Sequence, residues 1–241
     1  MLETALRTIR NNRRYFLLGS FAWIVIIAFL AVRSDFRTIL TVVVLAVGYA
    51  PAFLMTIAEH VRKATWAEKN ARSFAAILFT MLAVEFFNYI LTDLASDPTV
   101  APFVLQADSD LAPWHLNILA AAFAAICTML LYAALGPWFV RVAVDGLRGL
   151  GAMERLKALV LTIPRLIPAG LLLVVLNLVV IYRTDIGAAL GAVTTQYWAF
   201  LALAALVSLV VVVVCLTIKL FTAIAIADGY RQIEAVPQPS L

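Results

Sequence analysis

The chain has 241 residues, of which 64% are hydrophobic and only 13% are charged. Soluble domains carry about 45–50% apolar and about 25% charged residues, so this composition excludes an ordinary water-soluble domain. The net charge of +4 does not indicate nucleic-acid binding, because the basic residues fall mainly between long apolar blocks. These blocks are continuous, as in membrane helices, and lack the alternating polarity of a membrane β-barrel.

Six apolar blocks predict an all-α integral membrane protein with six transmembrane helices. They form one membrane domain, residues 1–234, before a tail at 235–241 that we expect to be disordered. The first block follows a basic leader but exceeds the usual length of a signal-peptide core, so we expect a retained helix. The predicted spans are residues 15–32, 38–58, 74–94, 115–140, 159–182 and 197–227.

Basic residues alternate between the segments that separate the six blocks. They gather in the leader and in the second and fourth loops, whereas residues 93–113 carry four aspartates and no basic residue. The positive-inside rule then places the basic segments and both termini in the cytoplasm. Lys219 in the sixth block is expected near the inner interface, where its ammonium group can snorkel to water.

A short motif recurs at the cytoplasmic ends of the second, fourth and sixth blocks. The copies read IAEHVR (57–62), AVDGLR (143–148) and IADGYR (226–231). Each has an acid and an arginine three positions apart, which face each other on a helix and can pair. The motif predicts three related helical hairpins; the alternative is that charges gather at cytoplasmic helix ends without any repeat. The three pairs are Glu59 and Arg62, Asp145 and Arg148, and Asp228 and Arg231.

An acidic residue, Glu85, interrupts the third block in the stretch AVEFFNYI (83–90). An ionisable residue inside the bilayer is costly and indicates a functional site by default. Asn88 follows on the same helix face, Asn177 in the fifth block lies at a comparable depth, and Tyr49 in the second can approach. Two hypotheses stay open: a solute, ion or proton site, or a glutamate that joins helices as structural glue.

The sequence contains no motif that indicates catalysis, a cofactor or a metal. It lacks phosphate-binding glycine loops, nucleophile elbows and metalloprotease motifs. His60 and His115 fall on opposite sides of the membrane in the predicted topology, so they cannot share a metal. We therefore expect a non-enzymatic protein with no metal and no cofactor.

The fourth loop, residues 145–168, is basic and amphipathic, and we expect a helix along the inner surface of the membrane. It resembles the coupling loop of binding-protein-dependent ABC importer permeases. That resemblance implies a cytoplasmic ATPase as partner and a transport subunit as the function. The residues that carry it are, in order, Asp145, Gly151, Ala152, Pro164 and Pro168.

The layout of the whole chain resembles that of small six-helix bacterial inner-membrane proteins of the YciC type. These are related to the membrane domain of some glycerophosphodiester phosphodiesterases, whose soluble catalytic domain is absent here. The shared features are a basic leader and loops such as VDGLRGLGAMERLKALVLTIPRL (144–166). Our leading hypothesis is a protein of the bacterial inner membrane that organises or traffics a membrane component, or supports a complex with other membrane subunits. The alternative is a transport subunit, either an ABC-type permease or a small channel with its site at Glu85.

Overall fold

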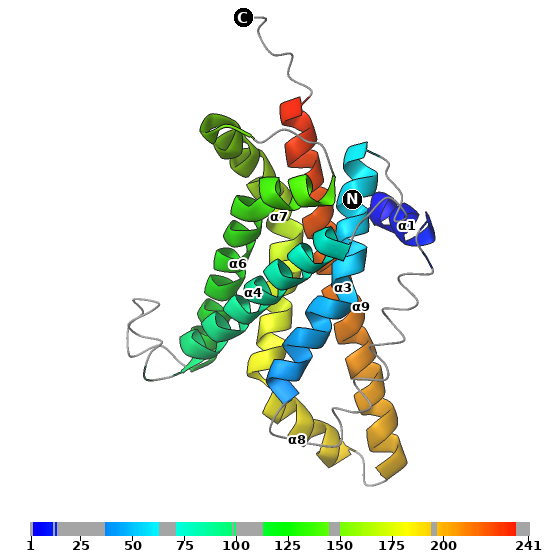
Figure 1. Cartoon of the computed structure of the whole chain (residues 1–241). Helices are drawn as coiled ribbons and strands as arrows, with labels where there is room; N and C mark the ends of the chain where they lie inside the picture. Colours follow the sequence, from blue (N-terminus) through cyan, green and yellow to red (C-terminus); the bar gives the residue numbers. More distant parts are fainter. Residues whose placement is uncertain are drawn as a thin grey trace, which may run out of the picture.

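Within the residues that the structure describes, all regular secondary structure is helical (Figure 1). The structure is a computed structural model that describes residues 2–11, 13, 37–62, 71–97, 99, 113–144, 150–193 and 197–234. The helices in these ranges are α1 Leu2–Asn11, α3 Arg37–Arg62, α4 Ala71–Ser96, α6 Pro113–Ala143, α7 Ala152–Ile181, α8 Arg183–Val193 and α9 Tyr197–Glu234.

Four of the described helices, α4, α6, α7 and α9, are long and apolar enough to cross a membrane. They coincide with the predicted third to sixth spans, and their apolar surfaces fit contact with a lipid bilayer. Helix α3 covers the predicted second span but is not among these four. The predicted first span, residues 15–32, and the predicted tail, residues 235–241, lie outside the described residues.

The long helices form an inner and an outer group. Helices α3, α6 and α9 run in one direction and contact one another, while α4 and α7 run back along the bundle (Figure 1). Helix α4 packs against α3 and α6, and α7 packs against α6 and α9. The most apolar windows of α6 and α9 are 44% and 50% buried, against 28% and 22% for α4 and α7. This layout is compatible with helical hairpins that each pair an outer helix with an inner one; the threefold repeat stays a prediction.

Aromatic and small side chains fill the space between the inner helices. The ring of Phe53 on α3 meets Phe139 on α6 edge to face, with 5.0 Å between ring centroids, and Tyr132 lies 6.0 Å from Phe53. Gly136 on α6 lets Ile226 on α9 approach closely. Small residues at such crossings allow the close van der Waals packing on which membrane helices depend.

Helix α7 differs from the expectation of a separate surface helix over residues 145–168. It begins at Ala152 and continues through Pro164 and Pro168, which lie inside it. Its buried stripe starts at Ala158, before both prolines, so residues 158–168 of the expected surface helix are part of the packed bundle. Proline is tolerated inside membrane helices because neighbouring groups re-satisfy the freed backbone.

The connection after α7 also differs from the sequence analysis, which predicted only a loop between the fifth and sixth spans. Residues Arg183–Val193 form the short helix α8 (Figure 1). Tyr182 separates α7 from α8, and its backbone N–H still bonds to the carbonyl of Leu178 at 2.9 Å. The chain therefore turns at Tyr182 without losing its helical hydrogen bonds.

Candidate functional site

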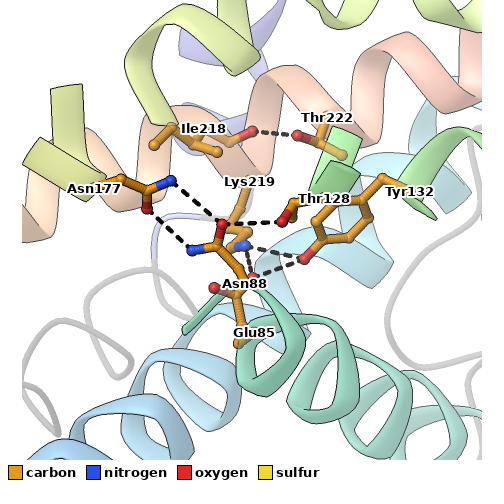
Figure 2. A network of polar contacts seen from close by, with 8 residues as sticks. All are labelled: Glu85, Asn88, Thr128, Tyr132, Asn177, Ile218, Lys219 and Thr222. Carbon is orange, nitrogen blue, oxygen red and sulfur yellow. Dashed lines mark hydrogen bonds and ion pairs between the residues drawn. The ribbon is translucent and has the colours of Figure 1, made fainter. Parts of the chain in front are cut away.

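Glu85 projects from α4 into the bundle, where it meets Lys219 from α9 and Tyr132 from α6 (Figure 2). Glu85 and Lys219 form an ion pair, and their side chains are only 11% and 5% exposed. The hydroxyl of Tyr132 donates to Glu85 Oε1 at 2.8 Å and accepts from Lys219 Nζ at 2.9 Å. The three groups form a closed triangle, which we call the charged cluster, and it joins α4, α6 and α9.

The position of Lys219 corrects the sequence analysis, which placed it at the inner interface. The prediction was wrong because α9 continues to Glu234, about four helical turns beyond Lys219. Lys219 lies at the centre of the candidate membrane span Ala205–Ile233, and Glu85 lies near the centre of the candidate span Ala75–Ser96. Opposite charges at matching depths were the signal in the sequence that could have identified this pair.

A second group of polar side chains, which we call the amide cluster, lies one helical turn from Glu85 (Figure 2). Asn88 Nδ2 donates to Asn177 Oδ1 at 3.1 Å, so the structure brings together these two predicted site residues. Asn177 Nδ2 also donates to the carbonyl of Ala121 at 3.2 Å, and Thr128 Oγ1 donates to Asn88 Oδ1 at 2.9 Å. The amide cluster therefore joins α4, α6 and α7, and both asparagines are buried.

Tyr49, the fourth predicted member of the site, lies outside these two clusters. Its side chain is buried, and its hydroxyl donates to the backbone carbonyl of Val212 on α9 at 2.8 Å. Tyr49 thus joins α3 to α9, while Tyr132 supplies the phenol that contacts Glu85. Sequence reasoning missed Tyr132, because a tyrosine in an apolar block is not distinctive.

Two of the three repeated helix-end motifs, residues 57–62 and 226–231, meet at one end of the bundle. Glu59 accepts a hydrogen bond from Asn11 Nδ2 at 2.9 Å, and Asp228 Oδ1 lies 3.7 Å from His60 Nε2. Both contacts join residues of different helices. The predicted pairs, in contrast, lie along a single helix. Burial lowers the pKa of His60, and the nearby carboxylate of Asp228 opposes this shift. Arg231 is exposed.

The remaining members of the motif, Asp145, Arg148 and the side chain of Arg62, lie outside the described part of the chain.

The residues of the predicted partner loop do not form one compact patch. Gly151 is exposed just before α7, and its N–H donates to Glu154 Oε2 at 2.9 Å. Ala152 starts the helix, and Pro164 follows about 18 Å further along it. Asp145, the first residue of the expected loop motif, lies outside the described residues.

The two clusters can hold four helices in register, because each of their hydrogen bonds joins two different helices. Their ionisable groups could also exchange a proton, since a carboxylate, an ammonium group and a phenol are in contact. Over the described ranges, no group of three histidine, cysteine, aspartate or glutamate side chains could hold a metal ion. The chemistry available at the site is therefore hydrogen bonding and proton exchange.

Across the ranges that the structure describes, the fold is all-helical, and four of these helices could cross a membrane by length and composition. Comparisons with known protein families, with curated proteins and with solved structures found no match to this chain. A fold of this kind serves many functions, so the function must be argued from the site itself.

Proposed function

We propose that this is a non-enzymatic protein of the bacterial inner membrane with six spans and both termini in the cytoplasm. Its role is to organise or traffic a membrane component, or to support a complex with other membrane subunits. The alternation of basic segments along the chain supports the topology. The whole-chain resemblance to membrane proteins of the YciC type is the reason for naming the bacterial inner membrane.

The closure of the charged cluster is the observation that carries this proposal. Glu85, Lys219 and Tyr132 satisfy one another inside the bundle, with little exposed surface. A transport site has to present its ionisable groups to water or cargo at some stage. Separating a buried ion pair leaves two desolvated charges and is strongly unfavourable. The closed triangle therefore favours a role in holding helices together over a role in transport.

A proton-flux measurement tests this proposal. The full chain is reconstituted in liposomes that contain a pH-sensitive dye, and a pH gradient is imposed across the membrane. We expect the gradient to decay as slowly as in protein-free liposomes, both for the wild type and for Glu85→Gln. A faster decay in the wild type that Glu85→Gln abolishes would overturn the proposal. Glu3→Gln, on exposed α1, is the matched control.

A transport subunit remains the second candidate, because ionisable groups meet near the centres of two candidate membrane spans. Such groups inside membranes commonly mark proton or ion pathways. The channel version makes Glu85 its site and predicts the faster decay described above.

The ABC-permease version predicts that the chain co-purifies with a cytoplasmic ATPase through residues 145–168. Gly151→Asp should abolish this association. The substitution is a sharp test, because aspartate is a favourable residue just before a helix and a Cβ at Gly151 has no neighbour closer than 3.8 Å. Unchanged co-purification in Gly151→Asp, or no ATPase at all, would end this version.

A further inference from the structure

A groove of about 320 Å³ lies between α6 and α7. Every residue that lines it is apolar, with Ala125 and Gly170 among the smallest. A Cβ added at Gly170 would lie 3.4 Å from the side chain of Met129, an ordinary contact distance, so there is room here for a methyl group. Ile126 and Ile167 are exposed, so the groove opens at the surface of the bundle.

Two basic side chains lie at one end of this groove. Arg141 on α6 follows Leu130 by 11 positions (141 − 130), which is about three turns and returns it to the same exposed face. Because Met129 faces Gly170, the antiparallel register places Arg141 level with Lys157 on α7. Both basic side chains are exposed. Along the helices, Arg141 lies about 16 Å from Leu130 and Lys157 about 9 Å from Ile163, the lining residue nearest to each of them.

We propose that the groove together with Arg141 and Lys157 binds one anionic phospholipid. The acyl chain fills the groove, and the phosphate lies between the two basic side chains. Hydrocarbon is the natural occupant of an apolar groove inside a membrane, and basic residues at the membrane surface attract anionic headgroups. The inference rests on the proposed function, since it identifies the membrane component that the protein handles.

Charge complementarity favours a lipid over another helix in the groove. Residues 14–36, outside the described part, connect α1 to α3. Helix α1 contacts α9 and donates from Asn11 to Glu59 on α3, on the other side of the bundle from the groove (Figure 1). An apolar helix, from this chain or from a second copy, would bring no negative charge to Arg141 and Lys157.

Native mass spectrometry of the full chain tests the proposal. The protein in detergent is mixed with phosphatidylglycerol or with phosphatidylcholine of the same acyl chains. We expect the wild type to retain phosphatidylglycerol in preference, on the order of tenfold, because each basic residue near the headgroup adds to the attraction. The double variant Arg141→Gln/Lys157→Gln should lose this preference, and Gly170→Phe, which fills the groove, should lose the bound lipid.

Two matched controls should keep the preference. Gly170→Ala adds a methyl group for which there is room, and Arg10→Gln/Arg13→Gln removes two exposed charges from the N-terminal segment. Circular dichroism checks that Gly170→Phe folds. If this variant does not fold, the lipid preference of the double charge variant alone tests the proposal.

Equal retention of both lipids by the wild type, or unchanged retention in the double charge variant, would overturn the proposal. A lipid-free dimer that Gly170→Phe dissociates would also overturn it, because a second copy would then occupy the groove. Failure of the proposed function is a separate outcome. Proton flux that depends on Glu85 would overturn the proposed function. Lipid retention is measured independently of proton flux, so the two failures can be told apart.

Discussion

Helix α6 presents two different surfaces only three residues apart. Tyr132 belongs to the charged cluster, whereas Met129 faces α7 across the apolar groove. On the first surface the polar groups bond to neighbouring helices, because hydrocarbon offers them no other partner. On the second surface lipid can replace side chains at little cost, since it is as apolar as they are. The comparison predicts large effects for substitutions on the polar side and small effects along the groove.

The largest expected effect comes from breaking the charged cluster at Glu85. Glu85→Gln leaves the ammonium group of Lys219 buried without a counterion. We expect the free energy of unfolding to fall by about 3–5 kcal/mol, the range for removing one partner of a buried ion pair. Chemical denaturation in mixed micelles measures it, and Glu3→Gln on exposed α1 is the control. A loss no larger than that of the control would show that the pair is not buried in the folded protein.

Helix α7 packs more tightly against α9 at Gly229 than against α6 at Gly170. A Cβ at Gly229 on α9 would collide with the hydroxyl of Thr162 on α7, whereas a Cβ at Gly170 meets Met129 at an ordinary 3.4 Å. We expect Gly229→Ala to destabilise the protein by about 1–3 kcal/mol through overpacking. Gly170→Ala should be neutral or slightly stabilising, because alanine is the better helix former. Thermal unfolding of the two variants in the same detergent compares them, and similar midpoints would contradict the account.

A smaller effect is expected in the amide cluster. Asn177→Leu removes one side of the amide pair and leaves Asn88 with Thr128 as its remaining cross-helix partner. Hydrogen bonds between membrane helices average about 0.6 kcal/mol, so the loss should be about 1 kcal/mol. Asn117→Leu is the matched control, because the bond of Asn117 to Tyr182 lies near the end of the helices rather than inside the bundle. A larger loss in the control would place the stabilising contacts outside the amide cluster.

The smallest effect concerns pH. Burial lowers the pKa of His60; Asp228 and Glu59 oppose the shift, while Arg231 and Arg7 add to it. The folded protein therefore prefers neutral histidine, and the unfolded chain takes up the proton first. This contribution to stability is present above about pH 6.5 and is lost as the pH falls toward the lowered pKa. We expect His60→Gln to reduce the loss of stability between pH 7 and pH 5, and an unchanged slope would contradict this.

Much of the helix layout could be predicted from the sequence, because an apolar block long enough to span a membrane is a strong compositional signal. The blocks that became α4, α6, α7 and α9 were recognised in this way. The depth of Asn177 relative to Asn88 also followed from counting residues from the ends of their blocks. The six-span count, the sides of the termini and the threefold repeat stay predictions.

The partner of Glu85 could not be predicted in the same way. Which face of α9 points inward, and how far the helix extends beyond the membrane, depend on packing against neighbouring helices. That is why Lys219 was placed at an interface instead of in the charged cluster. Pro164 and Pro168 were placed inside the fifth span and do lie inside α7, because a membrane bundle accommodates proline. What the sequence did not show is that this helix begins at Ala152, before the predicted span.

In our account, Glu85 and Lys219 neutralise each other inside a closed bundle. A double-mutant cycle that combines Glu85→Gln with Lys219→Met tests it most directly. We predict that the double variant is more stable than Glu85→Gln alone, since it removes the unpaired charge, with a coupling energy above about 2 kcal/mol. The account is contradicted if the two changes in the free energy of unfolding simply add in the double variant. Substitutions of two groups that do not interact destabilise the protein independently.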